Sequence, residues 1–311
     1  MNTVLASLIL VYGVIFVNGW TDAPNSIATA VSSGAIKYKN ATVLCGIFNL
    51  MGAFLGCLID TSVAKYVFSL SDSTKYSSLI VSISLFCMIV FGTVFSFFGL
   101  PSSESHAMIS CISGASFYLS NDVKNIKILV EVFVFTVFSC LIAFFISFFI
   151  RRFFKWNLNY KKLQIVSCSL NSVMHGYQSG LKFLGVILFL LGLNFNTKHV
   201  IPLSLSVGIF LCLGAFLGGK KIISSMGENL ASIDDISSFC SDIGTYISLL
   251  ICSLLGMPVS TGNVKCLSII GIALEEKKKI NKKTTIKLFI SFIIVFPICF
   301  FAGYFLISLF V

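Results

Sequence analysis

Long apolar runs separated by short polar stretches make up most of this chain. Five of the runs are about 20 residues long and hold at most one charged side chain: residues 40–59, 79–101, 128–150, 200–219 and 288–311. A helix of this length crosses the hydrocarbon core of a bilayer. One cleavable signal sequence cannot account for so many runs. The pattern therefore predicts an all-α polytopic protein that crosses the cell (plasma) membrane several times.

Polar positions recur in the same order in the two halves of the chain. A constant offset pairs Gly19 with Gly176, Asp22 with Ser179, Pro101 with Pro258, Ser103 with Ser260 and His106 with Asn263. The string Gly-Ala-Phe-Leu-Gly also occurs twice, at 52–56 and 214–218. Each half then contains about five membrane segments, the fourth of them short and headed by polar residues. Because five is odd, the second copy enters the membrane from the opposite side, which makes an inverted two-fold repeat.

Basic residues gather between the apolar runs and predict the orientation of the chain. The stretch 151–162 carries five Lys or Arg and no acid, and a second basic stretch lies at 277–283. Both should be cytoplasmic, with the two termini outside. We predict a first repeat at 1–150, a basic cytoplasmic linker at 151–162 and the second, inverted repeat at 163–311.

Composition narrows the class of protein further. Only 11% of the residues are charged, against about 25% in an average soluble domain. The net charge of +10 lies in the short loops, so it indicates orientation rather than binding to nucleic acid. The 11 cysteines occur singly, without a Cys-x-x-Cys pair, and are expected to act as small hydrophobic residues rather than as disulfides.

The first polar cluster, residues 18–25, follows an apolar segment directly. Gly19 and Pro24 should break the helix and free backbone groups there. Asp22 would place a carboxylate at membrane depth, which costs about 3 kcal/mol and requires a partner, most simply a cation. The alternative is that Asp22 lies at the membrane surface and caps the following helix.

The second cluster, residues 99–106, heads the short fourth segment. Three serines and free amides at a helix start can hold an oxyanion, because the amides and the positive end of the helix dipole both face it. Ser102 or Ser103 could equally be an ordinary N-cap, with Glu104 in the favourable first turn.

The second half repeats these clusters at residues 175–182 and 258–265. Lys182 and Lys265 are ionisable groups between apolar stretches, and an anionic substrate would be a natural partner for them. Either lysine could instead extend its amine to the membrane surface.

With these residues the chain resembles the inorganic phosphate transporter (PiT) family of sodium- or proton-coupled phosphate permeases, over essentially its whole length. The matches to the four family motifs are Asn18, Gly19, Asp22, Asn25, Ala28 and Thr29; then 99–106 in full; then His175, Gly176, Gly180, Lys182 and Gly185; then 258–261 with Lys265. They occur in the family's order.

The resemblance implies an inverted repeat in which broken helices or hairpins meet at a central site, and alternating access to that site. It implies phosphate ligands at Asn25, Ser102, Ser103, Ser105, Lys182, Ser260 and Thr261. It implies coupling-ion ligands at Asp22, Asn25, Glu104 and Thr261, of which Asp22 and Glu104 would hold sodium if sodium is used. Expected partners are phosphate, sodium or a proton, and lipid, and the resemblance makes a second copy of the chain a candidate partner. No other cofactor is expected.

The second half departs from the family pattern at four positions. Ser179 stands in place of an Asp, Leu181 in place of a Gln, and Gly262 and Asn263 in place of a Thr-His pair. Losing one carboxylate removes a charged ligand for a hard cation. We therefore expect fewer coupling ions, a switch from sodium coupling toward proton coupling, or weaker transport.

Three other functions compete with phosphate transport. Sulfate or another tetrahedral oxyanion would use the same donors, and a degenerate paralogue would act as a sensor or scaffold without transport. An intramembrane enzyme built on Glu104, Ser105 and His106 is not expected, because adjacent helix positions point in different directions and cannot form a catalytic line.

Overall fold

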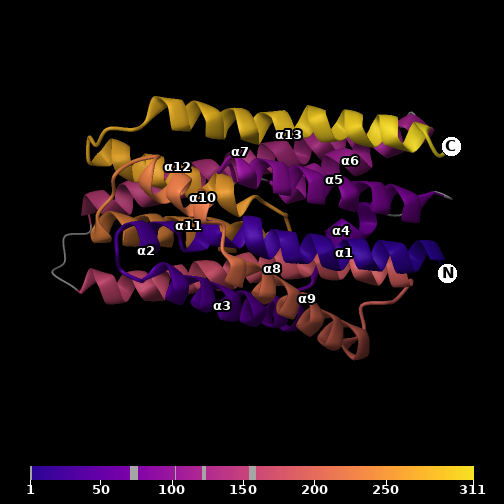
Figure 1. Cartoon of the computed structure of the whole chain (residues 1–311), viewed down its shortest axis with the longest axis horizontal. Helices are drawn as coiled ribbons and strands as arrows, with labels where there is room; N and C mark the ends of the chain where they lie inside the picture. Colours follow the sequence, from indigo (N-terminus) through magenta and orange to yellow (C-terminus); the bar gives the residue numbers. More distant parts are fainter. Residues whose placement is uncertain (1, 71–75, 102, 121–123, 154–158) are drawn as a thin grey trace.

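The computed structural model describes residues 2–70, 76–101, 103–120, 124–153 and 159–311, which form a bundle of helices lying roughly side by side (Figure 1). Within these ranges, eight helices are long and apolar enough to cross a membrane. They are α1 (Asn2–Thr21), α3 (Tyr38–Ile59), α5 (Ser77–Phe97), α7 (Lys124–Phe153), α8 (Tyr160–Leu191), α9 (Thr197–Leu217), α11 (Asp235–Leu254) and α13 (Lys282–Ser308). The all-α prediction is confirmed.

Shorter elements complete the fold. They are the 3₁₀ turn η1 (Ala23–Ser26), α2 (Ala28–Ser32), α4 (Ser62–Leu70), α6 (Glu104–Ser120), α10 (Lys220–Ile223), the π turn η2 (Ser224–Glu228) and α12 (Thr261–Glu275). The predicted linker 151–162 is largely helical where the structure describes it, because α7 continues to Phe153 and α8 starts at Tyr160.

The fourth segment of each half is a partial helix that turns back inside the bundle. With 17 and 15 residues, α6 and α12 are shorter than a bilayer requires. In Figure 1, α6 lies in the half of the bundle nearer the chain termini and α12 in the opposite half. Their starts meet, since a Cβ added to Gly262 would lie 2.8 Å from Cβ of Pro101. The α5–α6 and α11–α12 pairs are therefore two hairpins that enter from opposite ends.

The basic loops lie at one end of the bundle. Arg151 and Arg152 end α7, and the α12–α13 connection holds Lys277 and Lys278. Figure 1 shows both at the end opposite to the N and C termini. This arrangement agrees with the orientation expected from the charges.

The first helix is broken and its repeat partner is not. α1 ends at Thr21, and the chain passes through η1, with Pro24 in its first turn, before α2 begins. In the second half α8 continues through 32 residues. Leu181 occupies the repeat position of Pro24, so no backbone N–H is missing and the helix continues.

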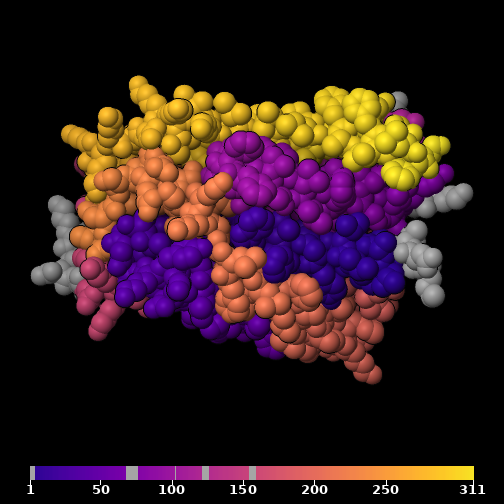
Figure 2. All heavy atoms as spheres, in the orientation of Figure 1, coloured from indigo at the N-terminus to yellow at the C-terminus, as the bar shows by residue number. Residues whose placement is uncertain are grey.

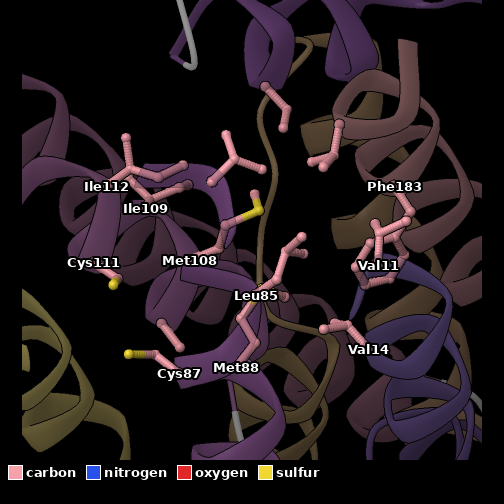
Figure 3. Close-up of a cluster of buried hydrophobic side chains, with 14 of the residues drawn as sticks. Val11, Val14, Leu85, Cys87, Met88, Met108, Ile109, Cys111, Ile112 and Phe183 are labelled. Carbon is pink, nitrogen blue, oxygen red and sulfur yellow. The ribbon is translucent and has the colours of Figure 1, made fainter. Parts of the chain in front are cut away.

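Central burial of α8 organises the packing of the other helices. In the apolar, membrane-spanning part of α8, 89% is buried inside the protein, against 28–61% in the corresponding parts of the other seven long helices. A cluster of apolar side chains from α1, α5 and α6, including Val14, Met88 and Met108, meets Phe183 of α8 (Figure 3). All 11 cysteines are free, and ten are buried, as expected for small apolar residues.

Glycines allow α3 and α8 to cross in backbone contact. A Cβ on Gly176 of α8 would collide with the Asn49 carbonyl of α3, and a Cβ on Gly52 would collide with the Val173 carbonyl. These collisions involve backbone atoms, which cannot rotate away. The crossing is therefore fixed by the absence of side chains.

We expect Gly176→Ala to lower the free energy of unfolding by about 2 kcal/mol, because overpacking forces the two backbones apart. Gly13→Ala is the matched control in α1, where the added Cβ would meet only Ile89 Cδ1, at 3.6 Å. That variant should be neutral or slightly stabilising. Thermal unfolding of both purified variants in detergent checks this, and equal melting temperatures would contradict the packing argument.

Candidate functional site

Asp22 lies at the break after α1 and is 4% exposed. Its Oδ1 accepts hydrogen bonds from Asn25 Nδ2 at 2.9 Å and from Thr261 Oγ1 at 3.0 Å. Its Oδ2 lies 3.4 Å from His175 Nε2 and 3.5 Å from Asn18 Nδ2. The carboxylate thus joins the first-half break to α8 and to the start of α12. This position is inside the bundle, so the alternative of a surface cap is wrong.

His175 presents one ring nitrogen to Asp22 and the other to α3. Asn49 donates its amide to the Cys45 carbonyl, so its Oδ1 is free to accept from His175 Nδ1 at 2.5 Å. Nε2 can then donate to Asp22 only when the ring carries a second proton. The contact therefore offers a place for a proton beside the carboxylate.

Several buried oxygens near Asp22 have no partner in the described part of the chain. They include Oδ1 of Asn18, Oδ1 of Asn25, Oε2 of Glu104 and Oγ of Ser103. Unsatisfied buried oxygens are uncommon and call for an ion, water or ligand. Carboxylate, amide and hydroxyl oxygens together form the kind of ligand set that hard cations prefer.

The start of α6 places Glu104 and Ser105 against α1 and α8. Glu104, 1% exposed, accepts from Thr21 Oγ1 at 2.7 Å. Ser105 Oγ lies 2.6 Å from Lys182 Nζ, which is the donor. Lys182 is itself 2% exposed and is close enough to interact electrostatically with Asp22 and Glu104. The idea that Lys182 extends to the membrane surface is therefore wrong.

The start of α12 uses one of its hydroxyls as a cap. Ser260 Oγ accepts from the backbone N–H of Asn263 at 3.4 Å and donates to Oδ1 of the same residue at 3.0 Å. Ser260 is thus engaged locally, as an N-cap, whereas Thr261 faces Asp22. Gly262 packs against the tip of the other hairpin, and a Cβ there would lie 3.1 Å from Asn25 Nδ2.

A second buried ion pair, Lys265 with Asp242 of α11, lies beside the first cluster. Asp242 also accepts from Thr29 Oγ1 at 2.9 Å and from Ser167 Oγ at 2.7 Å. Lys265 is therefore neither at the surface nor paired only with a substrate. Our sequence analysis missed Asp242, although a lone carboxylate in an apolar segment is a sufficient signal for a functional candidate.

A small cavity connects the two clusters. It measures about 10 Å³ and is lined by residues that include Asn25, Asn171, His175, Thr261 and Lys265. This space holds about one water molecule. A tetrahedral oxyanion does not fit in this cavity.

The structure brings most of the predicted site residues together. Asp22, Asn25 and Thr261 form one hydrogen-bonded group, and Lys182 joins Ser105. Glu104 is linked to the group by Thr21, the last residue of α1, which directly precedes Asp22. Ser102 lies outside the described residues.

Comparison with known proteins assigns a family to this arrangement. A model described as the phosphate transporter family matches the chain twice, over residues 18–161 and 156–303. A probable low-affinity inorganic phosphate transporter of Bacillus subtilis is 28% identical over 299 residues, covering 91% of this chain and 90% of the relative. The chain spans only 65% of a relative of the same description from Mycobacterium tuberculosis.

A sulfate permease of Bacillus subtilis is also similar, at 27% identity over 288 residues, with 82% of this chain and 73% of the permease covered. A solved structure described as the sodium-dependent phosphate transporter matches the fold with a TM-score of 0.82 at 17% identity. The match covers 100% of this chain and 99% of that one. The double family match, the inverted hairpins and the multi-pass bundle lead to one conclusion: this chain belongs to the phosphate transporter family, whose members are membrane transporters and not enzymes.

Proposed function

We propose that this chain is a secondary active transporter that moves inorganic phosphate across the membrane together with sodium ions or protons. The observation that carries the proposal is the group of buried oxygens of Asn18, Asn25 and Glu104 that have no partner among the described residues, beside the meeting point of two helix starts. In this proposal its partners are phosphate, the coupling cation, lipid and, by resemblance to the family, a second copy of the chain.

The anion would bind where the starts of α6 and α12 meet. Each start directs backbone N–H groups and the positive end of a helix dipole to the same region. The Ser103 hydroxyl there has no partner in the part of the chain that the structure describes, and Lys182 supplies a cation that already donates to Ser105. Lysine, hydroxyl and amide donors together match the several acceptor oxygens of a phosphate ion.

The coupling cation would bind at Asp22. Asn18 and Asn25 direct their amide nitrogens at its carboxylate, so their amide oxygens, which have no partner among the described residues, would turn toward a bound cation, and Thr261 adds a hydroxyl. In this proposal these groups ligate sodium. The space between Asp22 and His175 Nε2, which are 3.4 Å apart, is the place for a coupling proton.

Alternating access is the mechanism that we propose, and the size of the cavity supports it. Because about 10 Å³ cannot hold phosphate, Asn25, His175, Thr261 and Lys265 must separate before the anion enters. The elements that carry them come from both repeats, so rocking of one repeat against the other would open the site toward one side at a time.

Coupling to cations has an energetic reason. An inside-negative potential of 100 mV opposes the entry of each negative charge by about 2.3 kcal/mol. A phosphate dianion therefore needs about two accompanying positive charges to enter without opposition. A cation bound beside the anion also lowers the cost of burying both.

Sulfate is the second candidate cargo, because one similar protein is described as a sulfate permease. The buried carboxylates can distinguish the two anions. Phosphate carries a proton near neutral pH and can donate it to Glu104, whose Oε2 has no partner among the described residues. Sulfate has no proton to donate, so its oxygen and the Glu104 carboxylate oxygen would face each other as two hydrogen-bond acceptors.

We expect Asp22→Asn to reduce phosphate uptake into proteoliposomes about 100-fold, because the variant keeps the shape of the side chain and loses its charge. Glu131→Gln is the matched control, since Glu131 lies on α7 with its side chain 46% exposed. Full uptake by Asp22→Asn would exclude the coupling role. If the unmodified protein shows no uptake under a sodium or a proton gradient, another oxyanion or a non-transporting sensor or scaffold becomes the better assignment.

A sodium titration of phosphate uptake tests the number of coupling sites. Ser179 replaces the second motif carboxylate, and its hydroxyl lies 3.4 Å from His175 Nε2. With one carboxylate fewer, we expect either a non-cooperative sodium dependence or dependence on the proton gradient alone. A sigmoidal curve that requires two sodium ions would contradict this expectation.

Competition between anions tests the cargo. We expect a tenfold excess of arsenate, which carries a proton as phosphate does, to inhibit phosphate uptake, and the same excess of sulfate to have little effect. Glu104→Gln should reduce this selectivity, because an amide can donate to either anion. Equal inhibition by sulfate and arsenate in the unmodified protein would favour a general oxyanion carrier.

A further inference from the structure

A large pocket, separate from the central cavity, opens beside the tip of the first hairpin. Its volume is about 630 Å³, and its walls come from the end of α5, from α10 and η2, and from the first turns of α13. Figures 1 and 2 show these elements beside one another on the same face of the bundle. None of the residues assigned above to phosphate or to the coupling cation lines it.

The charge of this pocket is strongly positive. Lys220, Lys221 and Lys287 line it, together with Ser224 and Thr284. The lining includes no acidic residue, and the nearby Glu228 accepts a hydrogen bond from Ser224 Oγ at 2.6 Å. None of the three lysines forms an ion pair within the described part of the chain. Several ammonium groups converging with hydroxyls on one space are typical of a site for a phosphate group.

The position of the pocket places it at one surface of the membrane. Lys220 follows the apolar helix α9 directly, and Lys287 lies in the second turn of α13, just after the basic loop 277–283. The pocket thus lies in the half of the bundle that ends in the basic loops, the half predicted to face the cytoplasm (Figure 1). At its edge Phe97 and Phe98 are 60% and 75% exposed, so lipid chains can contact them.

Lys221 connects the pocket to the transport site. Its Nζ donates to the Phe97 carbonyl at 2.9 Å and lies 5.7 Å from the centre of the Phe97 ring. Gly99, with φ +68°, is held against the Lys221 backbone, where an added Cβ would be 3.1 Å from its carbonyl oxygen. Two residues further, Pro101 touches the tip of the second hairpin. A ligand bound in the pocket would therefore act through Lys221 on the position of the hairpin that carries Ser103 and Glu104.

We propose that this pocket is a second, peripheral site that binds the phosphate group of an anionic ligand at the cytoplasmic end of the hairpin. Two sources share this chemistry: the headgroup of an anionic phospholipid, whose chains would lie against Phe97 and Phe98, and free inorganic phosphate. The inference uses none of the central residues and is therefore independent of the proposed cargo.

The test compares two variants of the full-length protein in detergent. The pocket variant is Lys220→Gln with Lys287→Gln, which keeps Lys221 and its bond to α5. The matched control is Lys37→Gln with Lys162→Gln, two exposed lysines that lie in other basic loops and remove the same charge. Melting temperature is measured while phosphatidylglycerol, phosphatidylcholine or inorganic phosphate is titrated.

We expect phosphatidylglycerol to stabilise the unmodified protein and the control at similar concentrations, and the pocket variant to need about 30-fold more. Phosphatidylcholine, which has no net charge, should not distinguish the three proteins. If only inorganic phosphate separates the pocket variant from the control, the site takes the free anion. If the pocket variant and the control respond alike to every probe, the proposal is overturned, whatever the uptake experiments show.

Discussion

Burial of charge in a low-dielectric bundle is the constraint on which the rest of this structure depends. A carboxylate at membrane depth costs about 3 kcal/mol without partners, and Asp22 obtains them from η1, α8 and α12. Those elements are distant in sequence, so the charge is tolerated only when the whole fold is assembled. Glycines such as Gly176 and Gly262 allow the close approach that brings the donors within reach.

The sequence was sufficient to predict the parts of the fold that depend on local pattern. Apolar length predicts the spanning helices, Pro24 predicts the break, and the shared spacing of polar positions predicts that the two hairpins are inverted. It also identified Asp22, Asn25 and Thr261, which do form one group. The inferences about the fold use helix length, backbone chemistry or repeat spacing, all of which are visible in a linear string. The site roles of Asn25 and Thr261 came from the family resemblance.

The linear pattern did not predict in which direction these side chains point or which hydrogen-bond partners they have. Ser260 and Ser103 look equivalent in sequence, yet one hydroxyl caps α12 and the other has no partner among the described residues. The partners of Asp242 come from three other elements, and only tertiary packing brings them together. The departure at Gly262 also has a spatial reason, because a larger residue would press on Pro101.

The break in the first helix and the continuity of its repeat partner affect the side of the membrane to which the site would open. In a perfectly symmetric inverted repeat, a two-fold rotation about an axis in the membrane plane converts the state open to one side into the state open to the other, so the two are equal in free energy apart from the membrane's own asymmetry. Here the first repeat breaks at Pro24 while α8 is a continuous, buried helix. In the alternating access proposed above, the two states would therefore differ in which helix has to bend, so the chain itself would favour one orientation at rest.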